Sequence, residues 1–551
     1  MPEFLHIIWA TFLIILFFGG SIFVHEFGHY LAARRRGLKV DRFSIGFGPK
    51  LFSWTREGVE WRVSLFPLGG YVALPQLSDL EGIEGDYKSD PKKLPKISYQ
   101  DTLIVAVMGV VFNMIFAFAL ATVLWGIGRP STDSQQTTII GTVLEKIPDA
   151  QGVDKTGPGI LAGLQPGDKI LSIDGSKVEN WRDVKQFVVT GLGRGQNREP
   201  EMTLQIERAG QMLAITAHPI LSGPDKLRSL GILPQEELFV GQVFPGSPAQ
   251  KAGIQTGDQI LAVNGKNVLT FYDYDTLTGQ MGLNALKLTV ARVATIAHPQ
   301  PLPQGGENNI RGSTPNPGTA SPQTPSLRGE FPNLSNPQDP SSRSDASAGG
   351  GISRGSSAHG LEFTLTPQNV AISSSGEKHP MLGFSIEPKI ITVYQAPVEQ
   401  ICAAAALTWR TLATLVHPDS DIKLNHLSGP PGIAWVIYRL STDFRQVLSF
   451  IVLINVNLAI LNLLPLPVLD GGHIVLATVN RFRKKPISGE YIGTLQNIFS
   501  VLLLGLMVYV IFFSDVPRLK REWAQDAKDR ADQKAAITPD FSQTALPQKT
   551  P

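Results

Sequence analysis

The chain has 551 residues, a formal net charge of +2 and a single cysteine, Cys402. Its length allows several domains. So small a net charge provides no large basic surface, which argues against nucleic acid as a partner. One cysteine forms neither an internal disulfide framework nor a cysteine-based zinc site.

Four apolar segments have the length of a membrane-spanning helix: residues 5–24, 103–127, 447–464 and 495–513. A spanning helix needs about 20 predominantly apolar residues, or fewer where flanking groups reach the interface. The sequence therefore predicts a multi-pass α-helical membrane protein with four transmembrane helices.

Basic residues set the expected orientation of these helices. Clusters at residues 34–36 and 481–485 favour a cytoplasmic location for the loops that contain them. The N-terminus, the large region 128–446 and the C-terminal tail are then expected on the other side of the membrane.

The first apolar segment ends in the motif His25-Glu26-Phe27-Gly28-His29. Residues i and i+4 of a helix lie one turn apart on the same face. His25 and His29 can therefore bind one Zn²⁺, and Glu26 can activate a water molecule at the metal. A metal site at membrane depth indicates hydrolysis where water is scarce. The first domain, residues 1–128, holds this motif and the first two helices.

Between those helices, residues 51–72 alternate in polarity around Glu57-Gly58 and end with a segment that contains Gly69 and Gly70. This pattern predicts a β-hairpin on the cytoplasmic side. An exposed hairpin edge can pair with the unwound backbone of a substrate. An ordinary cytosolic hairpin is the alternative.

The region that follows contains an internal repeat, at residues 162–175 and 252–265. Each copy has a Gly-Asp turn, a short apolar strand and an Asp-Gly or Asn-Gly turn, as β-hairpins do. We expect two β domains, at 129–222 and 223–395. In the second domain, the hairpin arms 286–292 and 361–367 flank a segment rich in Pro, Gly and Ser. Such a composition predicts a disordered insertion, at 298–360.

Residues 396–416 are largely apolar but carry Glu399, Gln400 and Arg410. We expect an external or interfacial amphipathic helix rather than a fifth span. Residues 396–446 then form a peripheral segment. The third and fourth spans occupy 447–514, and residues 515–551 form a polar tail.

The third span leads into Asn462-Leu-Leu-Pro465-Leu-Pro467-Val-Leu-Asp470-Gly471-Gly472-His473. Together with the histidine motif, this segment resembles the site-2 protease family of intramembrane metalloproteases (family M50), and the repeat is similar to the tandem PDZ domains of some bacterial members. The resemblance implies that Asp470 is the third zinc ligand. His473 is the alternative ligand, and its other role would be a hydrogen bond near the site. A span at 396–416 would separate Asp470 from the two histidines, which supports four spans.

The resemblance also implies residues that position a substrate. It places Asn113 and Asn462 around the substrate and the zinc ion, with interhelical hydrogen bonding as the alternative. It makes the hairpin with Gly69 and Gly70 a membrane-associated element that presents its edge to the substrate. The family usually has a proline at the position of Val110. It is therefore an open question whether the second span is kinked.

Together these features predict a zinc-dependent intramembrane endopeptidase of the inner (cytoplasmic) membrane. By resemblance, it cleaves the transmembrane segment of a single-pass membrane protein after a first cleavage, as in regulated proteolysis of an anti-sigma factor. The active site is expected near the cytoplasmic face, with the PDZ domains outside. Those domains would bind peptide C-termini or exclude bulky ectodomains. The alternative is a non-catalytic PDZ membrane scaffold, which predicts that Glu26 or a ligand is missing, yet all four residues are present.

Overall fold

The computed structural model describes residues 3–76, 94, 95, 97–292, 360–371, 378–483, 487–535, 539 and 541. Residues 298–359 of the predicted insertion lie outside this part of the chain. Most of the predicted tail beyond residue 535 lies outside it as well.

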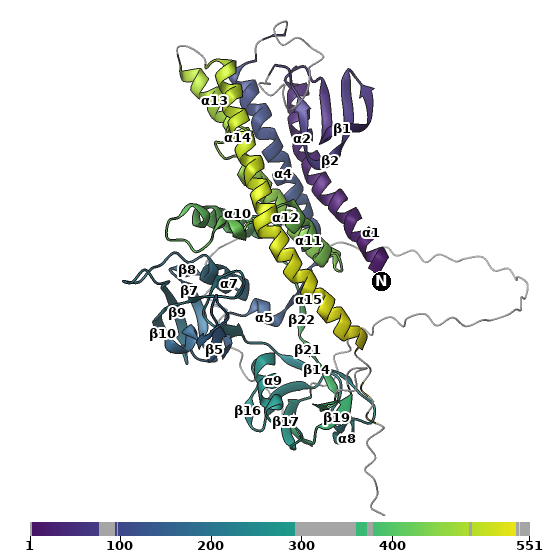
Figure 1. The fold of residues 1–551 in the computed structure, drawn as a ribbon, viewed down its shortest axis with the longest axis vertical. Coiled ribbons are helices and arrows are strands. Elements are labelled where there is room, and N and C mark those ends of the chain that lie inside the picture. Colours follow the sequence, from purple (N-terminus) through teal and green to yellow (C-terminus); the bar gives the residue numbers. More distant parts are fainter. Residues whose placement is uncertain are drawn as a thin grey trace, which may run out of the picture.

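Long apolar helices form the upright bundle in Figure 1. Its elements are α1 (Glu3–Leu13), the π turn η1 (Ile14–Phe18), α2 (Gly19–Arg35), α4 (Tyr99–Ile127), α12 (Phe444–Asn462), α13 (Asp470–Phe482) and α14 (Gly489–Val510). Helix α4 packs against α2, α12 and α13. Four stretches of the described chain are long and apolar enough to cross a membrane: Phe4–Arg35, Tyr99–Ile127, Phe444–Asn462 and Glu490–Ala531. They coincide with the four predicted spans.

The fourth span continues far past its predicted end at residue 513. A π turn, η4 (Ile511–Asp515), joins α14 to α15 (Val516–Ala535) without a break. The predicted boundary at 514/515 is therefore wrong, because it falls inside a continuous helix. Contacts with α11 (Pro430–Leu440) account for the extension: Trp523 packs edge-on against Trp435, and Asp526 accepts a hydrogen bond of 2.5 Å from Arg439.

Residues 397–416 form a helix, as predicted. Helix α10 (Pro397–Val416) crosses the lower end of the bundle (Figure 1). Its Ala404 is buried in a cluster with side chains of α4 and α12. It is not among the candidate spans in the described chain. A short 3₁₀ turn, η3 (Leu424–His426), follows it.

The predicted hairpin is present and longer than expected. Strand β1 (Arg42–Arg56) pairs with β2 (Val59–Ala73), and Glu57 and Gly58 take the positive φ angles of 51° and 77° that such a turn needs. The hairpin starts at Arg42 rather than at residue 51, because Phe43 is buried in a core shared with α2. Residues 42–45 pair with both 60–63 and 70–73, so β2 doubles back and its end forms an edge.

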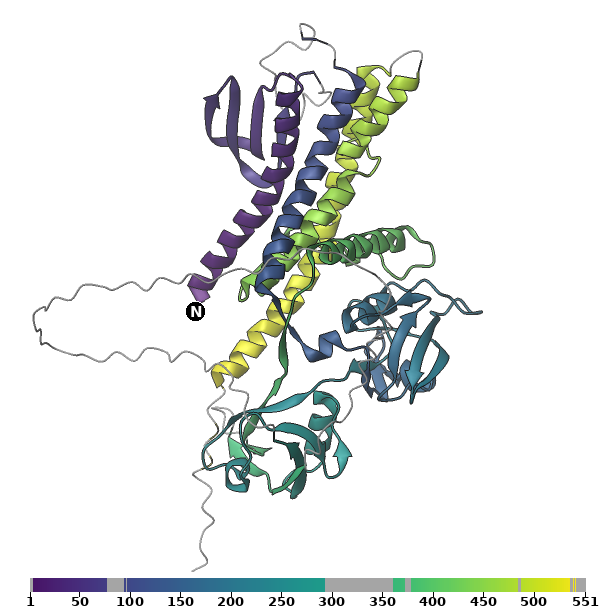
Figure 2. The ribbon, with the colours of Figure 1, turned by 180° about the vertical axis from the view of Figure 1, so that it is seen from behind.

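Two β domains hang below the bundle (Figures 1 and 2). The first contains β4 (Ile140–Val143), β5 (Lys146–Pro148), β6 (Asp154–Thr156), α6 (Pro158–Leu161), β7 (Lys169–Ile173), β8 (Ser176–Lys177), α7 (Trp181–Val189), β9 (Met202–Arg208), β10 (Gln211–Ala217), β11 (Ile220–Ser222), β12 (Leu227–Ser229) and β13 (Ile232–Pro234). One sheet has the order β10-β9-β7-β8, and β13 pairs with β4.

The second β domain repeats this plan. It contains β14 (Leu238–Val243), α8 (Pro248–Ala252), β15 (Gln259–Val263), β16 (Lys266–Asn267), α9 (Phe271–Gly279), β17 (Leu286–Ala291), β18 (Leu361–Leu365), β19 (Gln368–Ala371), β20 (Lys378–Met381) and β21 (Phe384–Pro388). Strand β17 pairs with β18, as the predicted hairpin arms require. Each domain also buries one aspartate on one arginine: Asp168 with Arg208, and Asp258 with Arg292.

The structure moves the boundary between these domains from residue 222 to the segment after Pro234. Leu230 is only 2% exposed and belongs to the core of the first domain. Strand β13 pairs with β4 of that same domain. Two further strands, β3 (Arg129–Thr132) and β22 (Ile390–Val393), pair with each other and connect the domains to the bundle, and a short helix, α5 (Asp133–Gln136), follows β3.

Candidate metal centre

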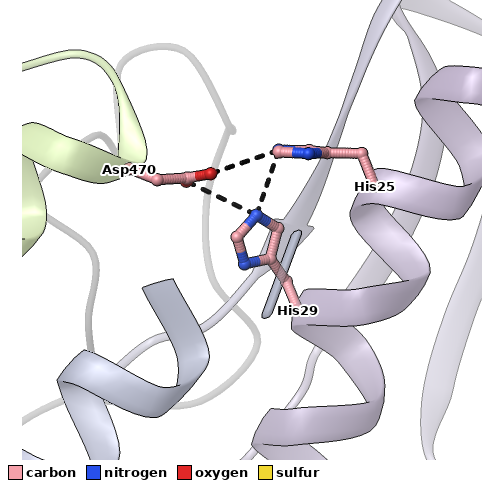
Figure 3. Close-up of side chains that lie close together, drawn as sticks. All are labelled: His25, His29 and Asp470. Carbon is pink, nitrogen blue, oxygen red and sulfur yellow. Dashed lines mark hydrogen bonds and ion pairs between the residues drawn. The ribbon is translucent and has the colours of Figure 1, made fainter. Parts of the chain in front are cut away.

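Three possible metal ligands meet at the end of the bundle that lies away from the β domains. His25 and His29 project from consecutive turns of α2, and Asp470 projects from the first turn of α13 (Figure 3). The Nε2 atoms of the two histidines are 3.1 Å apart. Each lies 3.4 Å from a carboxylate oxygen of Asp470. These three form the single ligand cluster found among the described residues, and His473 is not part of it.

A break between two helices puts Asp470 in position. Helix α12 ends at Asn462, and residues 463–469 form a loop before α13 starts. The loop contains Pro465 and Pro467, which cannot donate the backbone hydrogen bonds of a helix. It folds tightly against the first turn of α13. A Cβ at Gly471 would come within 2.4 Å of two loop carbonyls, and one at Gly472 within 2.0 Å of another.

Glycines bring α2 and α4 close together beside the ligands. A Cβ on Gly28 would lie 2.4 Å from the carbonyl oxygen of Met108. A Cβ on Gly109 would lie 2.3 Å from Nε2 of His29 and 2.7 Å from Cε1 of His25. Small residues allow this kind of close approach between membrane helices. Val110 continues the helix without a break in the described chain.

Helix α4 also orients both imidazoles. Nδ1 of His29 lies 2.8 Å from the carbonyl oxygen of Val105, to which it donates when that nitrogen carries the proton. The amide of Asn113 lies 3.3 Å from Nδ1 of His25, and its own oxygen is buried without a hydrogen-bond partner. An amide can be turned over without changing its shape. With its oxygen toward His25, Asn113 would accept a hydrogen bond from Nδ1–H, and Nε2 would be left for a metal.

Asn462 also belongs to this site. Its amide nitrogen lies 3.3 Å from Nε2 of His25, at the end of α12. Asn113 and Asn462 thus contact one candidate ligand from two different helices. Both contacts join different helices, so they agree with the predicted position near the site and with interhelical hydrogen bonding alike.

Glu26 lies beside the edge of the hairpin sheet. A Cβ on Gly70 would approach Cγ of Glu26 and the carbonyl oxygen of Ser44 to 2.9 Å each. Strand β2 therefore passes directly along α2 at this glutamate, and Gly69 precedes Gly70 in the same strand. The catalytic candidate and the expected substrate-binding edge meet at this point.

The donors fit a zinc ion. Ligands about 2.1 Å from a tetrahedral zinc ion lie about 3.4 Å from one another, and two imidazoles with one carboxylate are a common catalytic set. The separations here are 3.1 to 3.4 Å. One carboxylate oxygen of Asp470 is buried without a hydrogen-bond partner. A cation at this point would satisfy it.

Sequence reasoning missed three supports of the site: the space left by Gly109, the Val105 carbonyl, and Gln496 on α14. Gln496 is fully buried and donates a hydrogen bond of 3.3 Å to the carbonyl oxygen of Pro467. A glutamine in an apolar span is costly and usually functional, which is the signal that points to Gln496. The Val105 carbonyl gives no such signal in the sequence, because every residue has a backbone carbonyl.

Comparison with known proteins identifies the family. The model of peptidase family M50 matches residues 13–506. The chain belongs to peptidase family M50. It is accordingly a metalloendopeptidase, which confirms the predicted family and enzyme class.

Relatives of this M50 peptidase match it along most of their length. It is 30% identical to the "Protease RseP" of Yersinia pestis, over 93% of this chain and 99% of that protein. It is 28% identical to the "Putative zinc metalloprotease NMA0084" of Neisseria meningitidis, over 90% and 96%. Identity to the "Regulator of sigma-E protease RseP" of Escherichia coli is 27%, over 94% and 100%. The Neisseria name agrees with the predicted zinc cofactor.

Proposed function

We propose that this M50 peptidase is a zinc-dependent intramembrane endopeptidase that holds its metal on His25, His29 and Asp470. The observation that carries the proposal is their convergence. Two nitrogen donors on one candidate span and one oxygen donor after another lie within 4.8 Å of one another. No other grouping of this kind occurs in the described part of the chain.

The side chains around this cluster supply the rest of the chemistry. When bound, zinc acts as a Lewis acid toward water and the scissile carbonyl. Glu26 takes the proton of the attacking water and passes it to the leaving nitrogen. Asn113 and the Val105 carbonyl orient the two imidazoles. Asn462, next to His25, is placed to contact the peptide that enters the site.

We infer that the substrate is the transmembrane segment of a single-pass membrane protein. A helical substrate must unwind before hydrolysis, and its freed backbone then needs partners. Residues 70–73 pair with 42–45 on one side, and the described sheet has no strand on their other side. That edge borders Glu26, so a substrate strand added there is presented to the catalytic group.

The proposed orientation follows from the layout of the bundle. The hairpin and α13 lie at one end, and both β domains and α15 lie at the other (Figure 1). Basic loops favour the first end as cytoplasmic. The β domains, which we interpret as PDZ domains, then lie outside an inner membrane. There they bind peptide C-termini or exclude large ectodomains, so that the enzyme acts after a first cleavage, as on an anti-sigma factor.

The test is Glu26→Gln in the purified full chain. A general base contributes about 10²–10⁴-fold to the rate, so we expect cleavage of a model transmembrane substrate to fall by at least that lower factor. Zinc content should stay at one ion per chain, because Glu26 is not a ligand. Mass spectrometry of the products and metal analysis give the two readouts. Continued cleavage by the variant would overturn the assignment of Glu26.

A further inference from the structure

Two arginines of the first β domain converge on one carboxylate from outside that domain. Nε of Arg228 donates to one oxygen of Asp421 at 2.7 Å. Nη2 of Arg194 donates to the other oxygen at 2.8 Å. Asp421 belongs to the segment between α10 and η3 at the lower end of the bundle. Each carboxylate oxygen thus has its own guanidinium, an arrangement that binds carboxylates strongly.

The segment around Asp421 is inserted into the domain. Ser420 is 3% exposed and Ile422 is 8% exposed, although they flank a charged residue in a loop. The Arg228 side chain is fully buried. Its Nη2 atom has no hydrogen-bond partner among the described groups. Asp421 therefore leaves part of the hydrogen-bonding capacity of Arg228 unsatisfied.

A cavity of about 400 Å³ adjoins this contact. Apolar side chains of both partners line it, namely Val189 and Leu227 of the domain and Ile422 of the inserted segment. The rest of its lining is polar: Thr190, Asp225, Thr411, Thr414, His426 and Arg518. A carboxylate receptor next to a cavity with apolar side chains on both partners matches the end of a peptide chain, which has a terminal carboxylate beside its last side chain. Asp421 and Ile422 supply the same two groups from within the protein.

The internal repeat shows that the fold does not require these arginines. Leu230-Gly231-Ile232 in the first domain corresponds to Leu382-Gly383-Phe384 in the second, which puts Pro380 at the position of Arg228. Arg194 lies in the loop 190–201 after α7, and the corresponding loop of the second domain, 280–285, has no arginine. The pair is a feature of the first domain alone.

We propose that Arg194 and Arg228 form a carboxylate receptor that Asp421 fills in cis. A peptide with a free C-terminal carboxylate and an apolar last residue displaces Asp421 and releases the first β domain from the segment after α10. This latch would regulate the proposed PDZ domain. The choice of a peptide C-terminus as the ligand rests on the proposed function of that domain. It requires no catalysis.

The remaining contacts show what release would free. The Arg410 guanidinium of α10 stacks on the ring of Phe187 at 4.0 Å from its centroid. Nε2 of His426 lies 2.8 Å from the carbonyl oxygen of Asp225. Asp225 also pairs with Arg521 of α15 at 2.6 Å. Arg410 also donates to the hydroxyl of Ser176 at 3.0 Å, and Arg194 donates to the carbonyl oxygen of Asp419 at 2.6 Å and 3.1 Å. The ion pair of Asp225 with Arg521 is exposed and therefore weak. The buried pair at Asp421 is the centre of the interface.

The experiment measures binding of a labelled octapeptide that ends in valine to the full chain in detergent. Asp421→Asn keeps the shape of the side chain and removes its charge. We expect it to bind the free-acid peptide at least tenfold more tightly than the wild type does, and to show no such gain for the C-terminal amide. Asp419→Asn is the matched control, because Asp419 lies in the same loop and its side chain pairs with the exposed Arg198. Its contact with Arg194 is made by the backbone carbonyl, which the substitution keeps. It should bind like the wild type.

Hydrogen exchange in the wild-type chain keeps the proposal testable if Asp421→Asn folds poorly. Saturating acid peptide should raise exchange at residues 417–423, and the amide should not. No tightening in a folded Asp421→Asn chain, equal binding of the amide, or unchanged exchange would each overturn the latch. Glu26→Gln separates this proposal from the protease assignment. It should abolish cleavage and leave peptide binding intact.

Discussion

At the scale of single residues, the site depends as much on absent side chains as on present ones. Gly70 gives Glu26 its place against the sheet, and Gly109 gives both imidazoles theirs. Asn113 and Asn462 stood out in the sequence because an amide at membrane depth is unusual. Gly109 did not stand out, because a glycine in a membrane helix is common. Only the distances to its neighbours reveal its role.

Gly109→Ala should weaken zinc binding. The added Cβ would lie 2.3 Å from Nε2 of His29, so the imidazole has to move away from its ligand position. Misplaced supports of a metal site typically cost 10–100-fold in affinity, and we expect a loss of about that size. Chelator competition on the purified protein measures it.

Gly126→Ala is the matched control for that change. Gly126 lies on the same helix, and a Cβ there would have no neighbour within 4 Å. Its zinc affinity should equal that of the wild type. Equal affinities for both alanine variants would contradict the role given to Gly109.

At the scale of elements, the decisive feature is the break between α12 and α13. A helix in the membrane satisfies its own backbone, whereas the loop 463–469 makes only a few backbone hydrogen bonds of its own, such as those from Leu466 and Leu469. Gln496 of α14 supplies one partner by donating to the Pro467 carbonyl. The fourth span thereby supports the loop that presents Asp470, although it contributes no ligand.

Gln496→Leu should remove that support with little change in volume. We expect the chain to fold and to lose zinc about tenfold more readily, since partners behind a ligand contribute on this scale. Cobalt substitution offers a direct reading, because the absorption spectrum of Co²⁺ reports ligand geometry. An unchanged spectrum and unchanged metal retention would show that the loop holds its shape alone.

The latch at Asp421 should depend on pH. Burial opposes ionisation of Asp421, but hydrogen bonds from Arg194 and Arg228 outweigh it and hold its pKa below the usual range. A carboxyl whose pKa is lowered by folding stabilises the contact above its unfolded pKa, and this stabilisation is lost as the pH falls through the folded value. Exchange at residues 417–423, corrected for intrinsic rates, should therefore stay low from pH 8 to about 5 and rise below about 4.

Other titrating groups near the latch give a distinct alternative. His426 contacts the domain at Asp225, and His417 accepts a hydrogen bond from the Asp419 backbone. A pH-dependent rise that persists in Asp421→Asn would point to one of these histidines. Asp421→Asn should remove the acid-dependent rise altogether.

At the scale of the whole molecule, the proposed catalytic site and the proposed selection of substrates are separated in space. The hairpin and α13, whose first turn contains Asp470, lie at one end of the bundle, and the two β domains lie at the other (Figure 1). The long helix from α14 through α15 runs between these ends. It contacts the Pro467 loop near the metal and Asp225 of the first domain. One continuous helix thus connects the two regions.

The corrected domain boundary makes a prediction about fragments. A fragment of residues 129–236 contains β12, β13 and the buried Leu230, whereas one of residues 129–222 lacks them. Loss of two strands and a core leucine costs several kcal/mol, which is most of the stability of a small domain. The longer fragment should unfold cooperatively in urea, and the shorter one should not. Cooperative unfolding of both would restore the boundary at residue 222.

The sequence by itself determined the local features of this protein. Apolar length predicted four spans, and polarity alternation predicted the hairpin around Glu57. Repeated turns predicted two β domains, and the spacing of His25 and His29 predicted two of the three candidate metal ligands. These depend on neighbours within a few residues, so periodicity reveals them. Asp470 came only through the resemblance to known proteases.

Tertiary structure alone decided what holds these pieces in place. The start of β1, the end of α15 and the domain boundary all shifted because distant side chains bury or pair there. Arg228 and Asp421 are separated by 193 positions, and neither carries a signal of the other. Contacts of this kind arise from the packing of the folded chain, which no local pattern encodes.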